Sequence, residues 1–494
     1  MLPDLKTNTG EAPVIRGYWM TKAIRCLAVM AAVGLVTCGA RADWLTARGN
    51  AQRTGNVDGQ AGPKSPKVLW VQESTDHYIS APSPGKGVIF MPALGTLNSG
   101  VISAIASDAG VPKDKRVLWS KSQPFLKLPT VCSPAVTGGK IIFGDGMHQN
   151  ESPTLYCLDA ATGTTVWQLA LPGALIHLEG TPSVVDGKAY FGAGNGGVIA
   201  IDTEKVTLDG KDMEAGAVAQ VIAAKWKELQ EKYEADKKKD PDFAIPPTED
   251  ALPKPAPRTL WQQGAAGKWH VDCPVAVVGD NVIAGSAHLD AENSGDRALF
   301  CMKRGDGEIR WRADLKLNPW AGPSVTEQGD LAIVGCSSIR FDPKEIPGAK
   351  GEIVAVSMAD GGVKWRKDVN GGVVSPVAIS KSGLAIFTAT DKRVYALDAK
   401  TGDAKWTYEG KAPFFGGVAI AGETVYAADL NGVVHAINLA DGKGQWKLDV
   451  GKQTKAIGNI YASPVIDNGR LYIGTCNIDS QDAKKTVIVC VGDK

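Results

Sequence analysis

The residues of this chain best suited to chemistry are its histidines and the carboxylates near them. The sequence has six histidines, and His148, His177, His270 and His288 all have acidic residues within a few positions. Imidazole nitrogen and carboxylate oxygen together suit several divalent metals, so one hypothesis is a metal site that uses these four histidines. The alternative is a wide rim of solvated polar side chains, and our prediction for the chain is a site without metal.

The cysteines indicate packing rather than catalysis or metal binding. Seven of the nine cysteines follow position 42, and they form no CxxC, no CxxCH and no adjacent pair. Cys157 and Cys301 occupy a position that other copies of a repeat fill with alanine, and Cys490 lies in a similar strand. A free cysteine serves well as a small buried apolar residue. The glycine-rich run 192–197 lacks the following helix that a dinucleotide site needs, so we expect only a turn there.

Composition and charge exclude two broad classes of protein. The 494 residues carry 54 basic and 53 acidic side chains, and 44% of the residues are hydrophobic. A disordered chain would have lower hydrophobicity or a higher net charge. A nucleic-acid partner is not expected either, because such proteins usually present a strongly basic surface.

Residues 1–42 are predicted to be an upstream extension followed by a signal peptide. Lys22 and Arg25 precede a short apolar run over 26–37, and Ala40-Arg41-Ala42 matches a cleavage site. Cleavage after Ala42 would make the protein periplasmic or secreted, and lipidation of Cys38 is the alternative. No later run is long enough to span a membrane, which takes about 20 apolar residues.

An internal repeat covers the rest of the chain. In the segments 157–167, 301–311, 355–365, 396–406 and 436–446, a small residue is followed by glycine after six positions and by tryptophan after ten. Upstream of each copy come a proline, a tight turn and a β-rich run, as in 133–144. Each unit therefore reads as four short antiparallel strands, and a four-stranded repeat of about 40–50 residues is typical of a β-propeller blade.

The tryptophans set the predicted number of blades at eight. Seven blades end on a tryptophan, and the last unit lacks its outer strand, which residues 67–72 can supply. We expect these eight tryptophans to be blade-docking structural residues: Trp70, Trp119, Trp167, Trp261, Trp311, Trp365, Trp406 and Trp446. The prediction is an all-β, eight-bladed propeller over 43–494, with a helical and proline-rich insertion over 204–258 in blade three. That insertion either packs on its own propeller or docks another protein.

The pattern A-x-D-x-x-T-G-x-x-x-W, met by Ala396, Asp398, Thr401, Gly402 and Trp406, resembles the repeat of the pyrroloquinoline-quinone (PQQ) propeller family. The chain is closest in character to its non-catalytic branch, the outer-membrane assembly factor B type. That resemblance implies a scaffold in the cell envelope with a protein partner or a small-molecule ligand, and with no cofactor or catalysis. The alternative is a quinoprotein oxidoreductase that binds PQQ and calcium, although the adjacent cysteines of those enzymes are missing.

Topology predicts which face of the ring carries a binding site. The segment before each proline and the link between the second and third strands of each blade open on the same face. We therefore expect the following binding-face residues: His77, His148, His177, Glu179, Lys268, Trp269, His270, Asp272, His288, Trp320, Phe415 and Tyr461.

Overall fold

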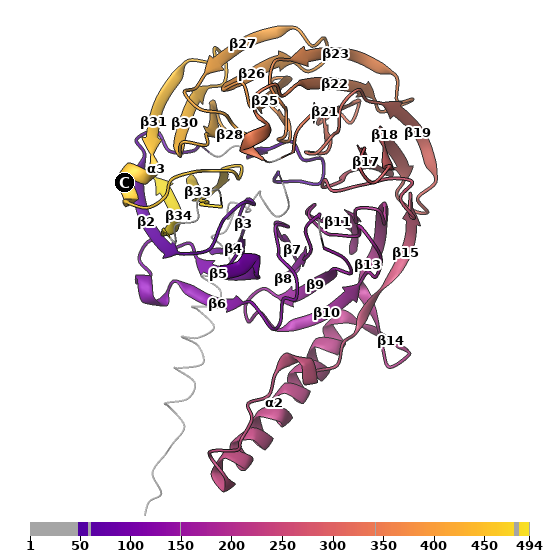
Figure 1. The fold of residues 1–494 in the computed structure, drawn as a ribbon, viewed down its shortest axis with the longest axis vertical. Coiled ribbons are helices and arrows are strands. Elements are labelled where there is room, and N and C mark those ends of the chain that lie inside the picture. Colours follow the sequence, from indigo (N-terminus) through magenta and orange to yellow (C-terminus); the bar gives the residue numbers. More distant parts are fainter. Residues whose placement is uncertain (1–47, 58–60, 149, 341, 479–483, 494) are drawn as a thin grey trace, which may run out of the picture. The chain divides into compact units, whose positions relative to one another are not determined.

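Eight antiparallel sheets follow one another around a ring in the computed structural model (Figure 1). The structure describes residues 48–57, 61–148, 150–340, 342–478 and 484–493. The eight-bladed propeller confirms the fold predicted from the repeat. The predicted signal peptide, its cleavage after Ala42 and the alternative lipidation of Cys38 lie outside the described residues.

The first four blades follow the chain in order, from the inner strand outwards. Their strands are β3 (Ser83–Gly85), β4 (Val88–Leu94), β5 (Gly100–Ala106) and β6 (Val117–Lys121); β7 (Ala135–Thr137), β8 (Lys140–Gly144), β9 (Thr154–Asp159) and β10 (Thr165–Ala170); β11 (Ser183–Val185), β12 (Lys188–Gly192), β13 (Val198–Leu208) and β15 (Ala256–Gln263); β16 (Ala276–Val278), β17 (Asn281–Leu289), β18 (Ser294–Lys303) and β19 (Ile309–Asp314).

The other four blades complete the ring. They contain β20 (Ser324–Val325), β21 (Leu331–Ser337), β22 (Gly351–Ser357) and β23 (Val363–Val369); β24 (Ala378–Ile379), β25 (Leu384–Ala389), β26 (Arg393–Asp398) and β27 (Ala404–Glu409); β28 (Ala419–Ala421), β29 (Thr424–Ala428), β30 (Val433–Asn438) and β31 (Gly444–Asp449); β32 (Val465–Asp467), β33 (Arg470–Gly474), β34 (Thr486–Gly492) and β2 (Lys67–Ser74). Blade eight thus takes its outer strand from the start of the chain, as predicted, which removes an open sheet edge.

The repeated glycine and tryptophan meet across the boundary between two blades. Trp365 of blade five donates its indole N–H to the carbonyl of Ala399 in blade six at 3.0 Å. A Cβ added to Gly402 would lie 2.7 Å from the same indole, so only glycine fits beneath the ring. Because buried aromatic rings remove a large apolar area from water, each copy of the repeat fastens one blade to the next.

A short N-terminal segment, residues 48–57, runs along the inner strands of blades four to seven. Its strand β1 (Asn56–Val57) pairs in parallel with β28. The Arg53 guanidinium donates to the carbonyls of Pro274, Ala321 and Pro323. Burial lowers the pKa of Arg53 to about 10, which still leaves it charged at neutral pH. This segment therefore ties distant blades together through buried backbone contacts.

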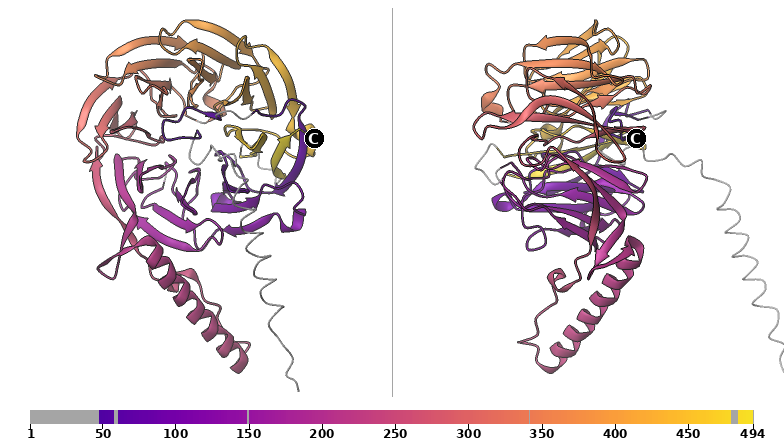
Figure 2. Two further views of the ribbon diagram at one scale, coloured as in Figure 1. Left: turned by 180° about the vertical axis from the view of Figure 1, so that it is seen from behind. Right: turned by 90° about the vertical axis from the view of Figure 1, so that its right-hand side faces the viewer.

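The insertion in blade three is half packed and half projecting. It continues from β13 through β14 (Lys211–Glu214) into the helix α2 (Ala215–Lys239), and Figures 1 and 2 show α2 extending away from the ring. Ala215, Val218 and Ile222 of its first turns are buried in the core of blades two and three. On the return path, Glu249 forms an ion pair with Lys121 of blade one.

The remaining helices in the part of the chain that the structure describes are short. They are α3 (Val450–Thr454) and the single 3₁₀ turns η1 (Thr96–Asn98), η2 (Lys113–Lys115), η3 (Glu249–Ala251) and η4 (Pro343–Glu345). Among the described residues, no helix combines the length and the apolar composition that crossing a membrane requires.

Candidate binding site at the channel mouth

Two imidazoles converge on a single carboxylate oxygen on the predicted face. Nε2 of His177 lies 2.6 Å from Oδ1 of Asp272, and Nε2 of His270 lies 3.0 Å from the same oxygen. His177 precedes β11, whereas His270 and Asp272 precede β16, so the entry segments of two adjacent blades bring them together. Both histidine side chains have no exposed surface, which makes this a buried polar contact rather than a solvated rim.

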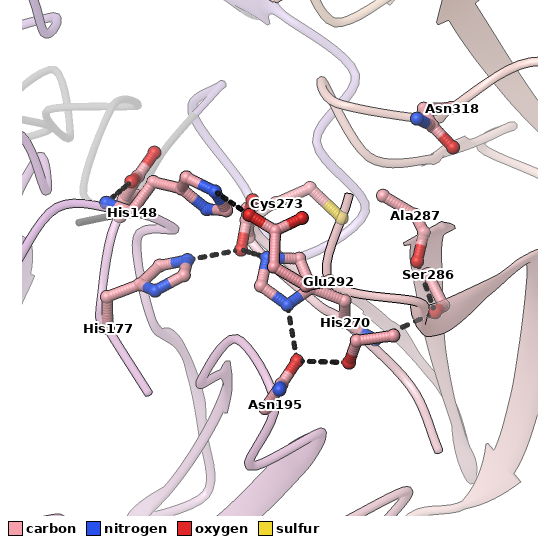
Figure 3. A network of polar contacts seen from close by, with 12 residues as sticks. His148, His177, Asn195, His270, Cys273, Ser286, Ala287, Glu292 and Asn318 are labelled. Carbon is pink, nitrogen blue, oxygen red and sulfur yellow. Dashed lines mark hydrogen bonds and ion pairs between the residues drawn. The ribbon is translucent and has the colours of Figure 1, made fainter. Parts of the chain in front are cut away.

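A third imidazole, His148, completes the cluster from the link between β8 and β9 (Figure 3). Its ring centroid lies 5.4 Å from that of His177 and 5.5 Å from that of His270, and those two centroids are 5.1 Å apart. The backbone N–H of His148 donates to Oε1 of Glu179 at 2.7 Å, which fixes the link in place. One potential ligand atom from each of the three histidines and Asp272 lies within 4.8 Å of the others.

Two glycines make room for the buried histidine rings. Gly194 has φ +52°, and a Cβ there would lie 2.9 Å from Cε1 of His177. Gly295 has φ +79°, and a Cβ there would lie 2.7 Å from Cβ of His270. The nearest atom to the added Cβ is a backbone carbonyl oxygen in both cases, Leu175 O at 2.3 Å and Ala287 O at 2.0 Å, so a side chain would displace the backbone as well as crowd a histidine.

Asn195 is a supporting residue that the sequence analysis missed. Its Oδ1 lies 2.7 Å from Nδ1 of His270 and accepts a second hydrogen bond from the Ser294 hydroxyl at 2.8 Å. Asn195 lies in the glycine-rich turn 192–197, which the sequence identified only as a connection between strands. The signal available in the sequence was an amide side chain directly after a glycine on the histidine-bearing face.

The charges of the cluster depend on one another. Burial raises the pKa of Asp272, but the His270 and His177 imidazoles outweigh it and hold that pKa well below its usual value. Burial lowers the pKa of His177, whereas the Asp272 carboxylate raises it, and the net direction is upward. Burial, aided by the Arg340 charge, lowers the pKa of His148 to about 4. His148 is therefore neutral at pH 7, with its ring lone pair available.

The cluster borders a cavity of about 410 Å³ inside the ring. His148, Glu179 and Asp272 line one part of its wall, and Arg48 and Arg53 of the N-terminal segment also line it. Three aromatic residues of the predicted binding face line the cavity too: Trp320, Phe415 and Tyr461. The Arg340 guanidinium lies over the Trp320 ring, 4.5 Å from its centroid. The cavity thus offers a largely apolar wall with a few charged groups.

Other predicted face residues lie apart from the cluster. His288 belongs to the end of β17 rather than to a link, and its Nδ1 lies 3.0 Å from the carbonyl oxygen of Gly295. Trp269 is buried and stacks on Phe300, with ring centroids 3.9 Å apart, so it is a core residue. Nδ1 of His77 accepts a hydrogen bond from the backbone of Asn477. Lys268 is exposed.

The cysteines lie in the interior of the blades. All seven that the structure describes are free and buried, among them Cys132 and Cys273 beside the blade-opening prolines. Burial raises the pKa of Cys132 and Cys301 to about 12, which keeps these thiols protonated and unreactive at neutral pH.

Comparison with known families matches the chain to one sequence profile. The profile described as "Outer membrane protein assembly factor BamB" matches residues 61–225 and 299–487. The outer membrane protein assembly factor BamB of Burkholderia pseudomallei is 28% identical over 221 residues, which cover 41% of this chain and 51% of that protein. The quinoprotein alcohol dehydrogenase PedH of Pseudomonas putida is 32% identical over 103 residues, which cover 19% of this chain and 17% of that protein. The chain therefore spans about half or less of these relatives.

Solved structures show the same fold at low sequence identity. BamB from Moraxella catarrhalis superposes with a TM-score of 0.54 and 13% identity, covering 87% of this chain and 98% of that one. A europium-containing methanol dehydrogenase superposes with a TM-score of 0.58 and 14% identity, covering 88% of this chain and 89% of that one. The same ring thus occurs in an assembly factor and in an enzyme, so function must be argued from the site.

Proposed function

The chain belongs to the family of the outer membrane protein assembly factor BamB, and from this premise we propose that it is a scaffold propeller of the cell envelope. In this proposal it binds a protein partner during the assembly of outer membrane proteins. The observation that carries the proposal is the match to the family profile over 61–225, which includes the first part of the insertion, and over 299–487.

The geometry of the insertion supports a binding role. Its return segment is anchored because Glu249 pairs with Lys121 and accepts a hydrogen bond from the Thr165 hydroxyl. Beyond that anchor, Phe243 is 82% exposed and Ile245 is 85% exposed. Two neighbouring exposed apolar side chains on an anchored projection form a suitable contact point for another protein.

The donor chemistry of the site argues against the quinoprotein alternative. Calcium in proteins takes six to eight oxygen ligands. The cluster of His148, His177, His270 and Asp272 offers three imidazoles and one carboxylate, which is mostly nitrogen and not oxygen. A calcium ion is poorly served by this set of four side chains.

The test is depletion of the chain in its own organism, followed by complementation. We expect outer membrane protein levels to fall on depletion and to recover with the intact chain. The double variant Phe243→Glu with Ile245→Glu should restore the outer membrane protein levels incompletely. The matched control is Lys411→Glu, an exposed substitution on the ring, which should restore them fully. A photo-crosslinker at Phe243 should capture a component of the assembly machinery. Two results together would contradict the scaffold function and favour the quinoprotein oxidoreductase. These are unchanged outer membrane protein levels on depletion and reduction of a dye by the protein after addition of PQQ and calcium.

A further inference from the structure

We propose that His148, His177, His270 and Asp272 bind one divalent transition-metal ion of the zinc class. This revises the sequence-based prediction of a site without metal. It is independent of the proposed scaffold function, because the four ligands lie at the channel mouth and not on the insertion.

The spacing fits a tetrahedral ion. Metal–ligand bonds of about 2.1 Å place tetrahedral ligand atoms about 3.4 Å apart and the centroids of bound imidazoles about 5.2 Å apart. The three centroid separations here are 5.1, 5.4 and 5.5 Å. The carboxylate oxygen lies 2.6 and 3.0 Å from the two Nε2 atoms, so these separations must widen by about 0.8 and 0.4 Å to reach the tetrahedral value and admit the ion.

Hydrogen-bond accounting points to a cation at the centre. Nδ1 of His270 faces the Oδ1 oxygen of Asn195, so that nitrogen must carry a hydrogen and donate it. In the neutral ring, Nε2 then carries a lone pair, and this lone pair faces the negative oxygen of Asp272 at 3.0 Å. Two facing electron pairs repel unless a proton or a metal ion lies between them, and a proton on Nε2 would serve only this pair, whereas one metal ion also binds the imidazoles of His148 and His177. A metal ion satisfies both groups at once.

Asn195 has the role of an outer-shell residue in a metal site. Histidines that bind metals almost always donate their second N–H to a carboxylate, a carbonyl or water, which fixes the tautomer and the ring orientation. Asn195 provides this acceptor for His270, and Ser294 in turn holds Asn195. Among the described residues, Nδ1 of His148 is buried without a hydrogen-bond partner, which leaves it available as a ligand.

The donor set selects the class of metal. Three imidazoles suit zinc, copper, nickel and iron, whereas magnesium and calcium prefer oxygen ligands. Four ligands from the protein are the usual complement of a structural zinc site. His148 is 23% exposed and lines the cavity, so the ion has a path of entry. The bound ion would join a link of blade two to the entry segments of blades three and four.

The experiment titrates the full chain, first treated with a chelator, with Zn²⁺ and with Co²⁺. We expect one equivalent of bound zinc by calorimetry and elemental analysis, a higher melting temperature, and the visible absorption bands of tetrahedral Co²⁺. Mg²⁺ and Ca²⁺ should give none of these effects. A wild-type chain that binds no stoichiometric zinc or cobalt, and whose melting is unchanged by chelator, would overturn the proposal.

Variants identify the ligands. His177→Ala combined with His270→Ala should weaken binding more than 100-fold. His148→Ala removes a half-buried ligand with little risk to folding and should weaken binding at least 10-fold. His288→Ala is the matched control, because His288 lies on the same face outside the cluster and should keep wild-type affinity. Equal zinc affinity in the wild type and in a folded His148→Ala variant would place the ion elsewhere and refute the assigned site.

Discussion

Two buried histidine–aspartate contacts occur on opposite sides of the ring, and they differ in how completely they are satisfied. In blade seven, His435 lies in β30, where its Nε2 is 3.0 Å from Oδ2 of Asp429 and its Nδ1 is 2.9 Å from the Tyr408 hydroxyl. Each ring nitrogen therefore has its own partner. At the mouth of the channel, by contrast, His177 and His270 share a single carboxylate oxygen with His148 beside them.

The difference shows what distinguishes a structural histidine from a ligand. Burial and a neighbouring carboxylate are common to both sites, so neither property identifies a binding site. What differs is how many imidazole nitrogens contact one carboxylate oxygen. Oδ2 of Asp429 contacts one histidine nitrogen, whereas Oδ1 of Asp272 contacts two. One histidine with two partners forms a closed hydrogen-bonded network, which stabilises the fold. Three histidines around one oxygen leave buried ring nitrogens without a hydrogen-bond partner among the residues that the structure describes, and one shared metal ion would use them as ligands.

The largest predicted effect is on stability, at the satisfied site. His435→Ala leaves both the buried Asp429 carboxylate and the Tyr408 hydroxyl without their shared partner, and each loss of this kind costs about 1–3 kcal/mol. His148→Ala in chelator-treated protein should cost less than about 1 kcal/mol, because that side chain is partly exposed. Denaturant unfolding of both variants measures the two losses. Similar losses would remove the distinction between the two sites.

The second prediction concerns Asp145, which begins the link that carries His148. Burial raises the pKa of Asp145 from 3.8 to about 6, although Thr154 and Tyr156 donate hydrogen bonds to it. The folded state then binds more protons than the unfolded state between pH 4 and pH 6, so this group lowers stability as the pH rises through that range. A shift of this size corresponds to about 3 kcal/mol.

Asp145→Asn should remove this dependence, because the amide stays neutral and the Tyr156 hydroxyl can turn to accept from it. We expect the variant to gain stability relative to the wild type as the pH rises from 4 to 6. Unfolding midpoints across this range, with Asp242→Asn as an exposed control, measure the gain. Parallel pH curves for the wild type and Asp145→Asn would contradict the raised pKa.

A third prediction compares the residues that support each histidine. Asn195→Ala removes the acceptor that orients His270 and should weaken zinc affinity about 10- to 100-fold, as other outer-shell changes do. Tyr408→Phe leaves a ring nitrogen of His435 without its partner and should cost about 1–3 kcal/mol of stability. Tyr408→Phe should leave zinc affinity unchanged. Calorimetry measures the zinc affinity of both variants, and denaturant unfolding measures their stability. Wild-type zinc affinity in Asn195→Ala would show that Asn195 has a purely structural role.

The smallest predicted effect concerns Glu292. Its Oε1 lies 3.9 Å from Nε2 of His148 at the partly exposed edge of the cluster. Exposed ion pairs contribute about 0–1 kcal/mol, so Glu292→Gln should change zinc affinity less than about threefold. A loss of tenfold or more in calorimetry would make Glu292 a ligand and would change the assigned set.

The fold was predictable from the sequence because its signals are local and repeated. Glycine and tryptophan recur at fixed spacing, and the missing outer strand of the last blade pointed directly to residues 67–72. The path of residues 48–57 along the inner strands was not predictable, because backbone hydrogen bonds and a buried Arg53 leave no periodic pattern. The helical pattern also did not predict that α2 projects from the ring beyond its first turns.

The sequence by itself determined the ring, the order of its blades and the face on which most histidines lie. These follow from strand periodicity and from the alternation of links in a four-stranded meander. Only the tertiary structure decided which histidines meet: His148, His177 and His270 converge on Asp272, whereas His288 bonds to its own hairpin and Trp269 enters the core. The physical reason is that a cluster depends on side-chain directions and on the room that Gly194 and Gly295 leave, and these are set by contacts between blades rather than by spacing along the chain.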